Sequence, residues 1–307
     1  MSFREELLHI ENKNLTEESL CIGKSESEVA DLFMAILQSG VHGFCFSPYE
    51  NGQQPGDVLT ETQVRRRLHI LQQHSNWVRS FSCTEGNELI PKIAKEMGMK
   101  TLVGAWLGTD KEKNKIEIDK LIELSNQGLV DIAGVGNEVL YRKDLTEEEL
   151  IHYISDVKAS VKNVPVGYID AYYEFVQKPT LVNICDIMLC NCYPFWEGTD
   201  FDHALSHMKN MYRSVKNVSG GKSVVITETG WPSQGQAIKQ SMPSSMNALK
   251  YFVDTQLWAK EEQIDVFYFS SFDESWKVGA EGDVGAHWGI WDSSEKLKFV
   301  PQLLKIG

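Results

Sequence analysis

The stretch VVITETGWPSQG, residues 224–235, changes character in its middle. It begins with the apolar run 224–226, which is typical of a strand buried on both faces. Glu228 then stands between two threonines, and a Gly-Trp-Pro turn follows at 230–232. A strand of core character that ends on a carboxylate either emerges into water there or carries chemistry at its end. The rest of the sequence has to decide between the two.

Short apolar runs of the same kind alternate with helical patterns along the whole chain. The eight strand candidates are residues 43–47, 77–81, 101–106, 131–138, 164–169, 185–193, 223–229 and 265–272. Apolar residues at helical spacing fill the stretches 60–74, 87–98, 114–128, 146–162, 201–216 and 244–262, with a weaker pattern near 171–181. Buried strands separated by helices indicate a parallel sheet with both faces covered, and eight such units close into a barrel.

An open, doubly wound sheet is the alternative architecture. Such sheets usually bind phosphates through a glycine-rich first turn, but the turn here, PYENGQQPGD at 48–57, is not GxGxxG. No linker, repeat or low-complexity segment interrupts the chain. We therefore predict an α/β fold, a single-domain (β/α)8 TIM barrel over residues 1–307, with residues 1–40 as an N-terminal extension packed on it.

The net charge and the hydropathy of the sequence limit the classes of binding partner that the protein can have. The formal net charge of -13 argues against nucleic acid, because phosphate backbones are held mainly by Lys and Arg. A neutral ligand such as a sugar is indifferent to this charge. No apolar run approaches the roughly 20 residues of a membrane span, and residues 1–14 lack the apolar core of a secretory signal. We expect a monomer without membrane contact, and localisation stays open because a leader can be absent from the sequence.

Metal and disulfide chemistry are not expected. The six cysteines are scattered, and several fall inside apolar runs, where reduced cysteine behaves as a small hydrophobe. His203 and His207 have the i, i+4 spacing of a helical metal site, but no HExxH glutamate accompanies them. We interpret the two histidines as a polar helix face and predict neither a metal nor a cofactor.

Polar residues gather where the predicted strands end, which is where barrels of this kind hold their active sites. They are Arg79, Asn137, Glu138, Asn191, Tyr193, Glu228, Asp273, Glu274 and Lys277. Glu138 and Glu228 end the fourth and seventh strands, across the barrel mouth from each other. One glutamate alone is as readily a solvated carboxylate, but two suit glycoside hydrolysis, which needs one neutral and one ionised carboxyl group. Arg79 or Lys277 would hold one of them charged.

Tryptophans crowd the same end of the barrel. Trp106, Trp196, Trp231, Trp276, Trp288 and Trp291 stand at or just past strand ends. Each ring is either a platform for the face of a sugar or a cap on the barrel core. Trp196 is the best candidate for a sugar contact, because CYPFWEG (192–198) is a loop beyond the sixth strand.

Four segments together resemble glycoside hydrolase family 17, the β-1,3-glucanases and glucanosyltransferases, in its compact bacterial and fungal form. They are GVGNEVLYR (134–142), NCYPFWEG (191–198), ITETGWPSQG (226–235) and SSFDESWK (270–277). The resemblance extends over residues 43–292. It implies a retaining mechanism with Glu138 as general acid/base and Glu228 as nucleophile.

The resemblance also implies roles for the neighbouring side chains. Asn137 would bind the sugar 2-hydroxyl, Tyr193 would hydrogen-bond the nucleophile, and Glu274 with Lys277 would order the site. Arg79 matches the family's arginine on the second strand. Further substrate contacts are predicted for Tyr49, Trp196 and Trp231.

The predicted function is that of a retaining endo-β-1,3-glucanase acting on laminarin-type glucan. A β-1,3-glucanosyltransferase is the first alternative, because it shares the covalent intermediate. A non-catalytic glucan-binding barrel is less favoured, since both carboxylates are present. The family is usually secreted, whereas this sequence shows no signal peptide.

Overall fold

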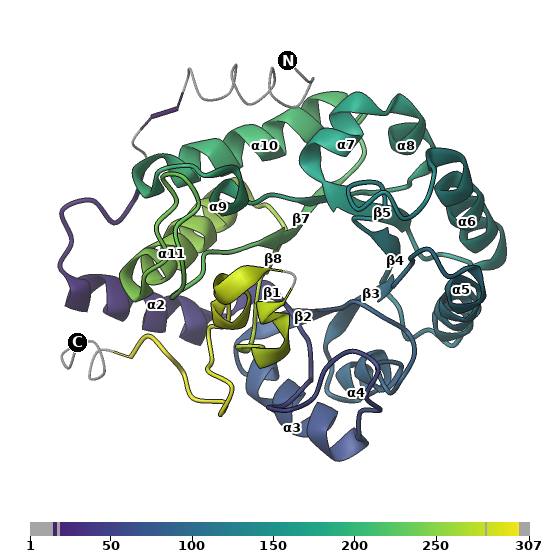
Figure 1. Ribbon diagram of the computed structural model, residues 1–307, viewed down its shortest axis with the longest axis horizontal. Helices are drawn as coiled ribbons and strands as arrows, with labels where there is room; N and C mark the ends of the chain where they lie inside the picture. Colours follow the sequence, from purple (N-terminus) through teal and green to yellow (C-terminus); the bar gives the residue numbers. More distant parts are fainter. Residues whose placement is uncertain (1–14, 17–18, 280, 301–307) are drawn as a thin grey trace.

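The computed structural model describes residues 15–16, 19–279 and 281–300 and has eight parallel strands closed into a barrel (Figure 1). The strands are β1 (Val41–Cys45), β2 (Ser75–Ser80), β3 (Lys100–Ala105), β4 (Ile132–Asn137), β5 (Val166–Ala171), β6 (Met188–Asn191), β7 (Val224–Thr229) and β8 (Val266–Tyr268). Each strand pairs with the next, and β8 pairs with β1. The predicted (β/α)8 barrel is confirmed.

Helices surround the barrel on its outside (Figure 1). They are α2 (Glu26–Ser39), α3 (Glu61–Gln72), α4 (Leu89–Glu96), α5 (Lys111–Asn126), α6 (Glu147–Ser160), α7 (Tyr172–Gln177), α8 (Pro179–Ile184), α9 (Pro194–Glu197), α10 (Ala204–Val218) and α11 (Ser245–Glu262). The described residues also form the 3-10 helices η1 (Phe201–His203), η2 (Ser275–Val278) and η3 (Gly282–His287).

The helix boundaries follow local chemistry. The Thr146 side chain and Glu149 form a reciprocal capping box that starts α6. Asp110 caps α5, so that helix begins three residues before the predicted stretch at 114. The weak helical pattern near 171–181 is two helices, because the proline at 179 disfavours helical backbone at Lys178, whose φ is -124°.

The part of the predicted N-terminal extension that the structure describes includes α2, whose buried Phe33 packs edge-on against Phe252 of α11 at 5.2 Å. Residues 1–14 and 17–18 of that extension lie outside the described residues. The six cysteines are buried, in agreement with the prediction that they fill the core. Among the described residues no helix has the length and apolar character needed to cross a membrane.

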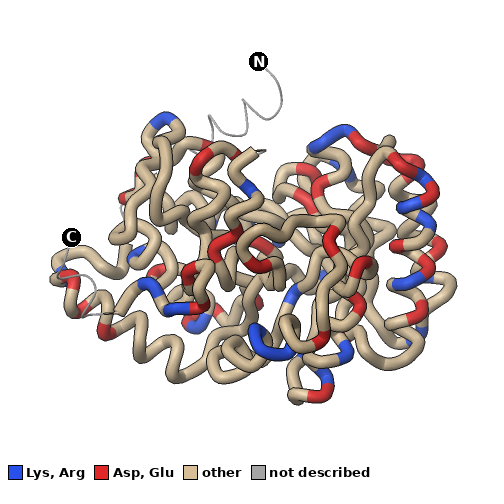
Figure 2. The backbone as a smooth tube through the Cα atoms, turned by 60° about the horizontal axis from the view of Figure 1, so that its bottom comes forward, with Lys and Arg blue, Asp and Glu red and all other residues tan. Residues whose placement is uncertain are grey.

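Charged positions are intermixed on the outer helices, as the alternation of acidic and basic segments at the right of Figure 2 shows. On α5, for example, Lys115 pairs with Asp119, and Lys111 reaches Glu149 of α6. These pairs are exposed and contribute little to stability.

The strand register brings the exits of β4, β5, β6 and β7 level with one another. Asn137 pairs with Ile169, Ala171 with Asn191, and Asn191 with Glu228. Each of the β4–β5, β6–β7 and β7–β8 pairings has a register shift near these exits. Register shifts of this kind change the direction in which side chains point at the rim of a barrel. Here they lie next to the polar residues of the site.

Candidate active site

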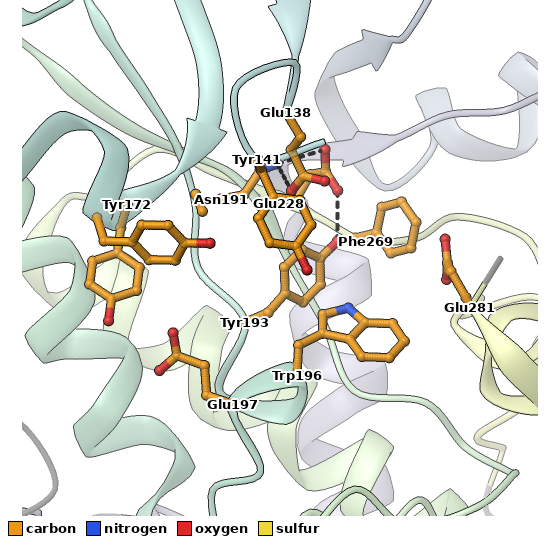
Figure 3. A pocket seen from close by; sticks show the side chains of 12 residues that line it. Glu138, Tyr141, Tyr172, Asn191, Tyr193, Trp196, Glu197, Glu228, Phe269 and Glu281 are labelled. Carbon is orange, nitrogen blue, oxygen red and sulfur yellow. Dashed lines mark hydrogen bonds between the residues drawn. The ribbon is translucent and has the colours of Figure 1, made fainter. Parts of the chain in front are cut away.

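Glu138 and Glu228 line one pocket of about 270 Å³ at the carboxyl end of the barrel. Glu228 lies on β7, whereas Glu138 follows β4 with a φ of 54°. This left-handed conformation is uncommon for a residue other than glycine and is found at functional sites. Figure 3 shows the two carboxyl groups beside each other, with the Tyr193 hydroxyl reaching the pair.

Asn191 bridges the two glutamates. Its Nδ2 lies 2.9 Å from Oε1 of Glu138 and 3.1 Å from Oε1 of Glu228, so these two oxygens are about 6 Å apart at most. The Thr227 hydroxyl donates to Asn191 Oδ1 at 2.8 Å, which fixes the orientation of the amide. The sequence marked Asn191 as a strand-end residue without giving it a role. Its bridging position depends on the pairing of β6 with β7.

Glu228 is surrounded by donors. Arg79 Nη1 forms an ion pair with Oε1 at 2.7 Å, and the Tyr193 hydroxyl donates to Oε2 at 2.8 Å. Arg79 is fully buried, and its Nη2 donates to Asn137 Oδ1 at 2.7 Å. Burial alone would lower the pKa of Arg79, but the Glu228 carboxylate raises it above its ordinary value. These contacts favour an ionised carboxylate at Glu228.

Glu138 has a different environment. Burial, followed by the charge of Glu228, raises its pKa from 4.5 to about 7. The hydrogen bond from Asn191 and the charges of Arg142 and Arg79 act in the opposite direction. Glu138 thus keeps its proton up to about pH 7, beside a partner that accepts three donors, which is the arrangement of an acid paired with a nucleophile or base.

Glu274 and Lys277 form an ion pair at one side of the pocket, with 3.0 Å between Nζ and Oε2. Lys277 Nζ also lies 4.0 Å from the centre of the Phe269 ring, which lines the pocket. Neither member of the pair lines the pocket itself. Glu281 does line it, and its carboxylate lies 3.9 Å from Lys277. The Glu274–Lys277 pair therefore lies outside the pocket lining and supports the side of the pocket formed by Phe269 and Glu281.

Trp231 and Tyr49, two of the predicted substrate contacts, are buried beside the pocket. Trp231 is 1% exposed, its Nε1 donates to Met242 O at 2.9 Å, and its ring packs edge-on against Phe195. Tyr49 is 7% exposed, and its hydroxyl accepts a hydrogen bond from Asn87. Both rings support the loops around the site and lie outside the pocket lining.

Trp196 does line the pocket, packed on Phe195 and Trp288. Of the other tryptophans, Trp288 and Trp291 are buried, whereas Trp106 is 44% exposed and lies under the Arg142 guanidinium. Several pocket residues were not predicted from the sequence. Tyr172 and Tyr173 open α7, Glu197 ends α9, Phe269 directly follows β8, and Tyr141 and Glu281 lie in loops.

The predicted polar helix face of His203 and His207 is wrong for His207. This side chain is fully buried, with Nε2 2.8 Å from Oε2 of Glu197 and Nδ1 3.0 Å from the Thr199 hydroxyl. The turn of α10 directs it inward, where it holds a residue of the pocket wall. Within the described ranges, no three His, Cys, Asp or Glu side chains are grouped as metal ligands would be.

Two neighbouring carboxyl groups at the ends of β4 and β7 of a (β/α)8 barrel, in different environments, are typical of glycoside hydrolases. Residues 43–289 match the family model of the BtgE/BtgC glycoside hydrolase domain. The chain is also 31% identical to a glycoside hydrolase family 17 β-1,3-glucanosyltransferase from Rhizomucor miehei, over 86% of this chain and 97% of that one, with a TM-score of 0.76. The chain therefore belongs to glycoside hydrolase family 17, and the resemblance seen in its sequence is confirmed.

Other proteins similar to this chain have names that refer to β-1,3-glucan or its oligosaccharides. An active-site mutant of the Rhizomucor miehei enzyme, in complex with laminaritriose, is 30% identical with a TM-score of 0.77, over 86% of this chain and 97% of that chain. A glucan 1,3-β-glucosidase of Candida albicans is 27% identical over 258 residues, which cover 76% of this chain and 83% of that protein. A putative glucan endo-1,3-β-glucosidase of Aspergillus niger is 29% identical over 78% of this chain and 40% of its own length.

Proposed function

We propose that this enzyme cleaves β-1,3-glucan internally by a retaining double displacement. The observation that carries the mechanism is the Asn191 bridge, which limits the Oε1 atoms of Glu138 and Glu228 to about 6 Å. Retaining enzymes hold their two carboxyl groups roughly 5–5.5 Å apart, whereas inverting enzymes need about 6.5–9.5 Å to admit a water. The short separation supports retention.

In the first step, Glu228 attacks the anomeric carbon and forms a glycosyl ester while the glycosidic C–O bond breaks. Glu138 gives its proton to the leaving oxygen. In the second step Glu138 takes a proton from water, whose oxygen attacks the same carbon and releases Glu228. Asn137 is the proposed contact for the sugar 2-hydroxyl.

Neighbouring groups support this division of roles. The Tyr193 hydroxyl and the Arg79 guanidinium would orient the two oxygens of the nucleophile. Trp196 offers a partly exposed ring at the pocket, suited to the apolar face of a glucosyl unit. Glu274 and Lys277 would keep the Phe269 wall in place.

β-1,3-Glucan is the proposed substrate because the relatives are named for it and because one of them was solved with laminaritriose. The name of the Aspergillus niger relative favours internal cleavage. Transfer to a second glucan chain is the alternative outcome, favoured by the 31% identity to a glucanosyltransferase. Both reactions share the glycosyl-enzyme, and they differ in whether water or a sugar hydroxyl accepts the glycosyl group.

Proton NMR of the products of laminarihexaose tests the mechanism and the outcome together. Retention predicts that the newly formed reducing ends appear first as the β-anomer, before mutarotation. An initial α-anomer would overturn the proposed mechanism. Mass spectrometry of the same reaction separates the outcomes, because products longer than six units require transfer, whereas hydrolysis gives only shorter ones.

A further inference from the structure

The backbone segment that carries Glu138 is held from β5. Glu138 N donates to Ile169 O at 2.8 Å, Leu140 N donates to the Tyr168 hydroxyl at 3.0 Å, and Tyr141 N points to Asp170 Oδ2 at 3.4 Å. Tyr168 and Asp170 are both completely buried. Two side chains of one strand therefore fix the turn in which Glu138 adopts its positive φ.

Asp170 and Tyr168 act as one unit, because the Tyr168 hydroxyl donates to Asp170 Oδ2 while accepting from Leu140 N. Ala171 N donates to the other oxygen of Asp170 at 2.7 Å. The carboxyl group thus only accepts hydrogen bonds, from one hydroxyl and two backbone N–H groups.

No Lys or Arg of the described chain forms an ion pair with Asp170. The charged groups that act on it are Glu138 at the exit of β4 and Glu174 on α7. Glu174 is engaged with Lys178 at 2.5 Å. Glu138 is therefore the pocket residue to which Asp170 is coupled.

We propose that Asp170, together with Tyr168, is a positioning residue for the general acid. The unit holds the turn that aims Glu138 at the glycosidic oxygen. This inference rests on the proposed role of Glu138 as acid/base. Asp170 does not touch the substrate and acts through Glu138.

The electrostatics couple the same two residues. Burial first, and the charge of Glu138 second, raise the pKa of Asp170 from 3.8 to about 8, and the pKa of Glu138 is raised to about 7. Two carboxyl groups coupled in this way titrate as a pair, and a charge on one opposes ionisation of the other. Because the pKa of Asp170 is the higher of the two, Asp170 does not take the charge first, and it acts on Glu138 through the turn that it holds.

The test uses the dependence of the rate on the leaving group. The leaving group of 2,4-dinitrophenyl β-laminaribioside departs as a dinitrophenolate and needs no proton from Glu138. The leaving sugar of laminarihexaose does need that proton. A defect in the general acid therefore slows cleavage of laminarihexaose far more than formation of the glycosyl-enzyme from the dinitrophenyl substrate. Asp170→Asn should lower kcat/KM for the hexaose on the order of 10- to 100-fold and leave the activated substrate within a few-fold. Equal losses on both substrates would mean a merely structural role and would overturn the proposal.

The pH profile gives a second readout. Because Asp170 acts by holding the turn and not by its charge, the basic limb of kcat/KM for Asp170→Asn should stay near that of the wild type. A limb displaced to lower pH would show that Asp170 acts by its charge and would overturn a role limited to positioning. Tyr168→Phe keeps the carboxylate but removes the link to Leu140 N, so it should show the leaving-group effect with little shift of the limb.

Asp254→Asn is the matched control. Asp254 is a buried aspartate on α11 that accepts the Leu20 N–H at 2.9 Å, away from the pocket. Its replacement should leave both the substrate ratio and the pH profile unchanged. Glu138→Gln separates this inference from the proposed function: if Glu138→Gln shows the leaving-group effect and Asp170→Asn does not, only the role of Asp170 fails.

Discussion

Tyr193 and Arg79 contact opposite oxygens of the Glu228 carboxylate, with the hydroxyl 2.8 Å from Oε2 and the guanidinium 2.7 Å from Oε1. The carboxylate is therefore fixed in rotation before a substrate arrives. A nucleophile oriented in advance loses little freedom in the transition state. The contributions of the two donors can be separated by mutation, because the Tyr193 hydroxyl is neutral whereas the Arg79 guanidinium is a buried charge.

Tyr193→Phe should lower kcat for laminarihexaose on the order of 10-fold, with KM nearly unchanged, because it removes an orienting donor and keeps the ring. Steady-state kinetics at one pH measure the effect. The ring packs against Phe269 and Trp288, so the melting temperature should remain near that of the wild type. An unchanged kcat would contradict the proposed role of Tyr193.

Arg79→Met should destabilise the protein by about 3–5 kcal/mol, because it leaves the buried Glu228 without its counter-charge. Urea unfolding at pH 7 measures the free energy of unfolding. The double variant with Glu228→Gln should recover a large part of the loss, since no uncompensated carboxylate remains. A double variant as unstable as Arg79→Met would indicate that packing against Phe81, and not charge, accounts for the loss.

Glu228→Ala and Glu138→Gln should each abolish turnover of laminarihexaose, while calorimetry should still detect its binding. The first variant lacks the nucleophile, and the second lacks the transferable proton but keeps the shape of the side chain. Wild-type-like turnover by either variant would refute the assignment. Glu281→Gln is a useful comparison, because it changes a third carboxyl group of the same pocket.

The free energy of unfolding should depend on pH through Glu138. Its pKa is raised from 4.5 to about 7 in the folded protein, so between these values the folded state binds a proton that the unfolded state has lost. Stability is complete below about 4.5 and falls as pH rises towards 7, by up to about 3 kcal/mol. Glu138→Gln should remove this dependence and exceed the wild type in melting temperature at pH 8 but not at pH 4.

The barrel and the two glutamates could be predicted because their signals are local. Eight apolar runs mark the strands, and Glu138 and Glu228 interrupt or follow such runs. Which neighbours meet at the strand ends depends on register and on loops, which the pattern does not specify. The fifth strand was predicted to end at residue 169, so Asp170 fell outside it, although β5 continues to Ala171.

Burial of loop residues was the least predictable part of the site. Trp231 and Trp196 both follow strand ends, and the sequence offers no means to tell a ring inserted under a loop from one facing a pocket. His207 was misjudged for the same reason, since its helical spacing does not say which neighbours cover that face. In each case the deciding contacts come from segments remote in sequence, such as Phe195 against Trp231 and Glu197 against His207.

Trp196→Ala and Trp231→Ala should separate binding from stability. Trp196 lines the pocket, so its removal should raise KM for laminarihexaose several-fold while the melting temperature changes little. Trp231 is enclosed by Phe195, Phe201 and Tyr251, so its removal leaves a large cavity and should cost about 3–5 kcal/mol of stability. Trp231→Phe fills part of that cavity and should recover part of the loss. Trp231→Phe should not weaken glucan binding. If it raised KM as much as Trp196→Ala does, the Trp231 ring would have to contact the substrate, and the interpretation of Trp231 as a buried packing residue would be wrong.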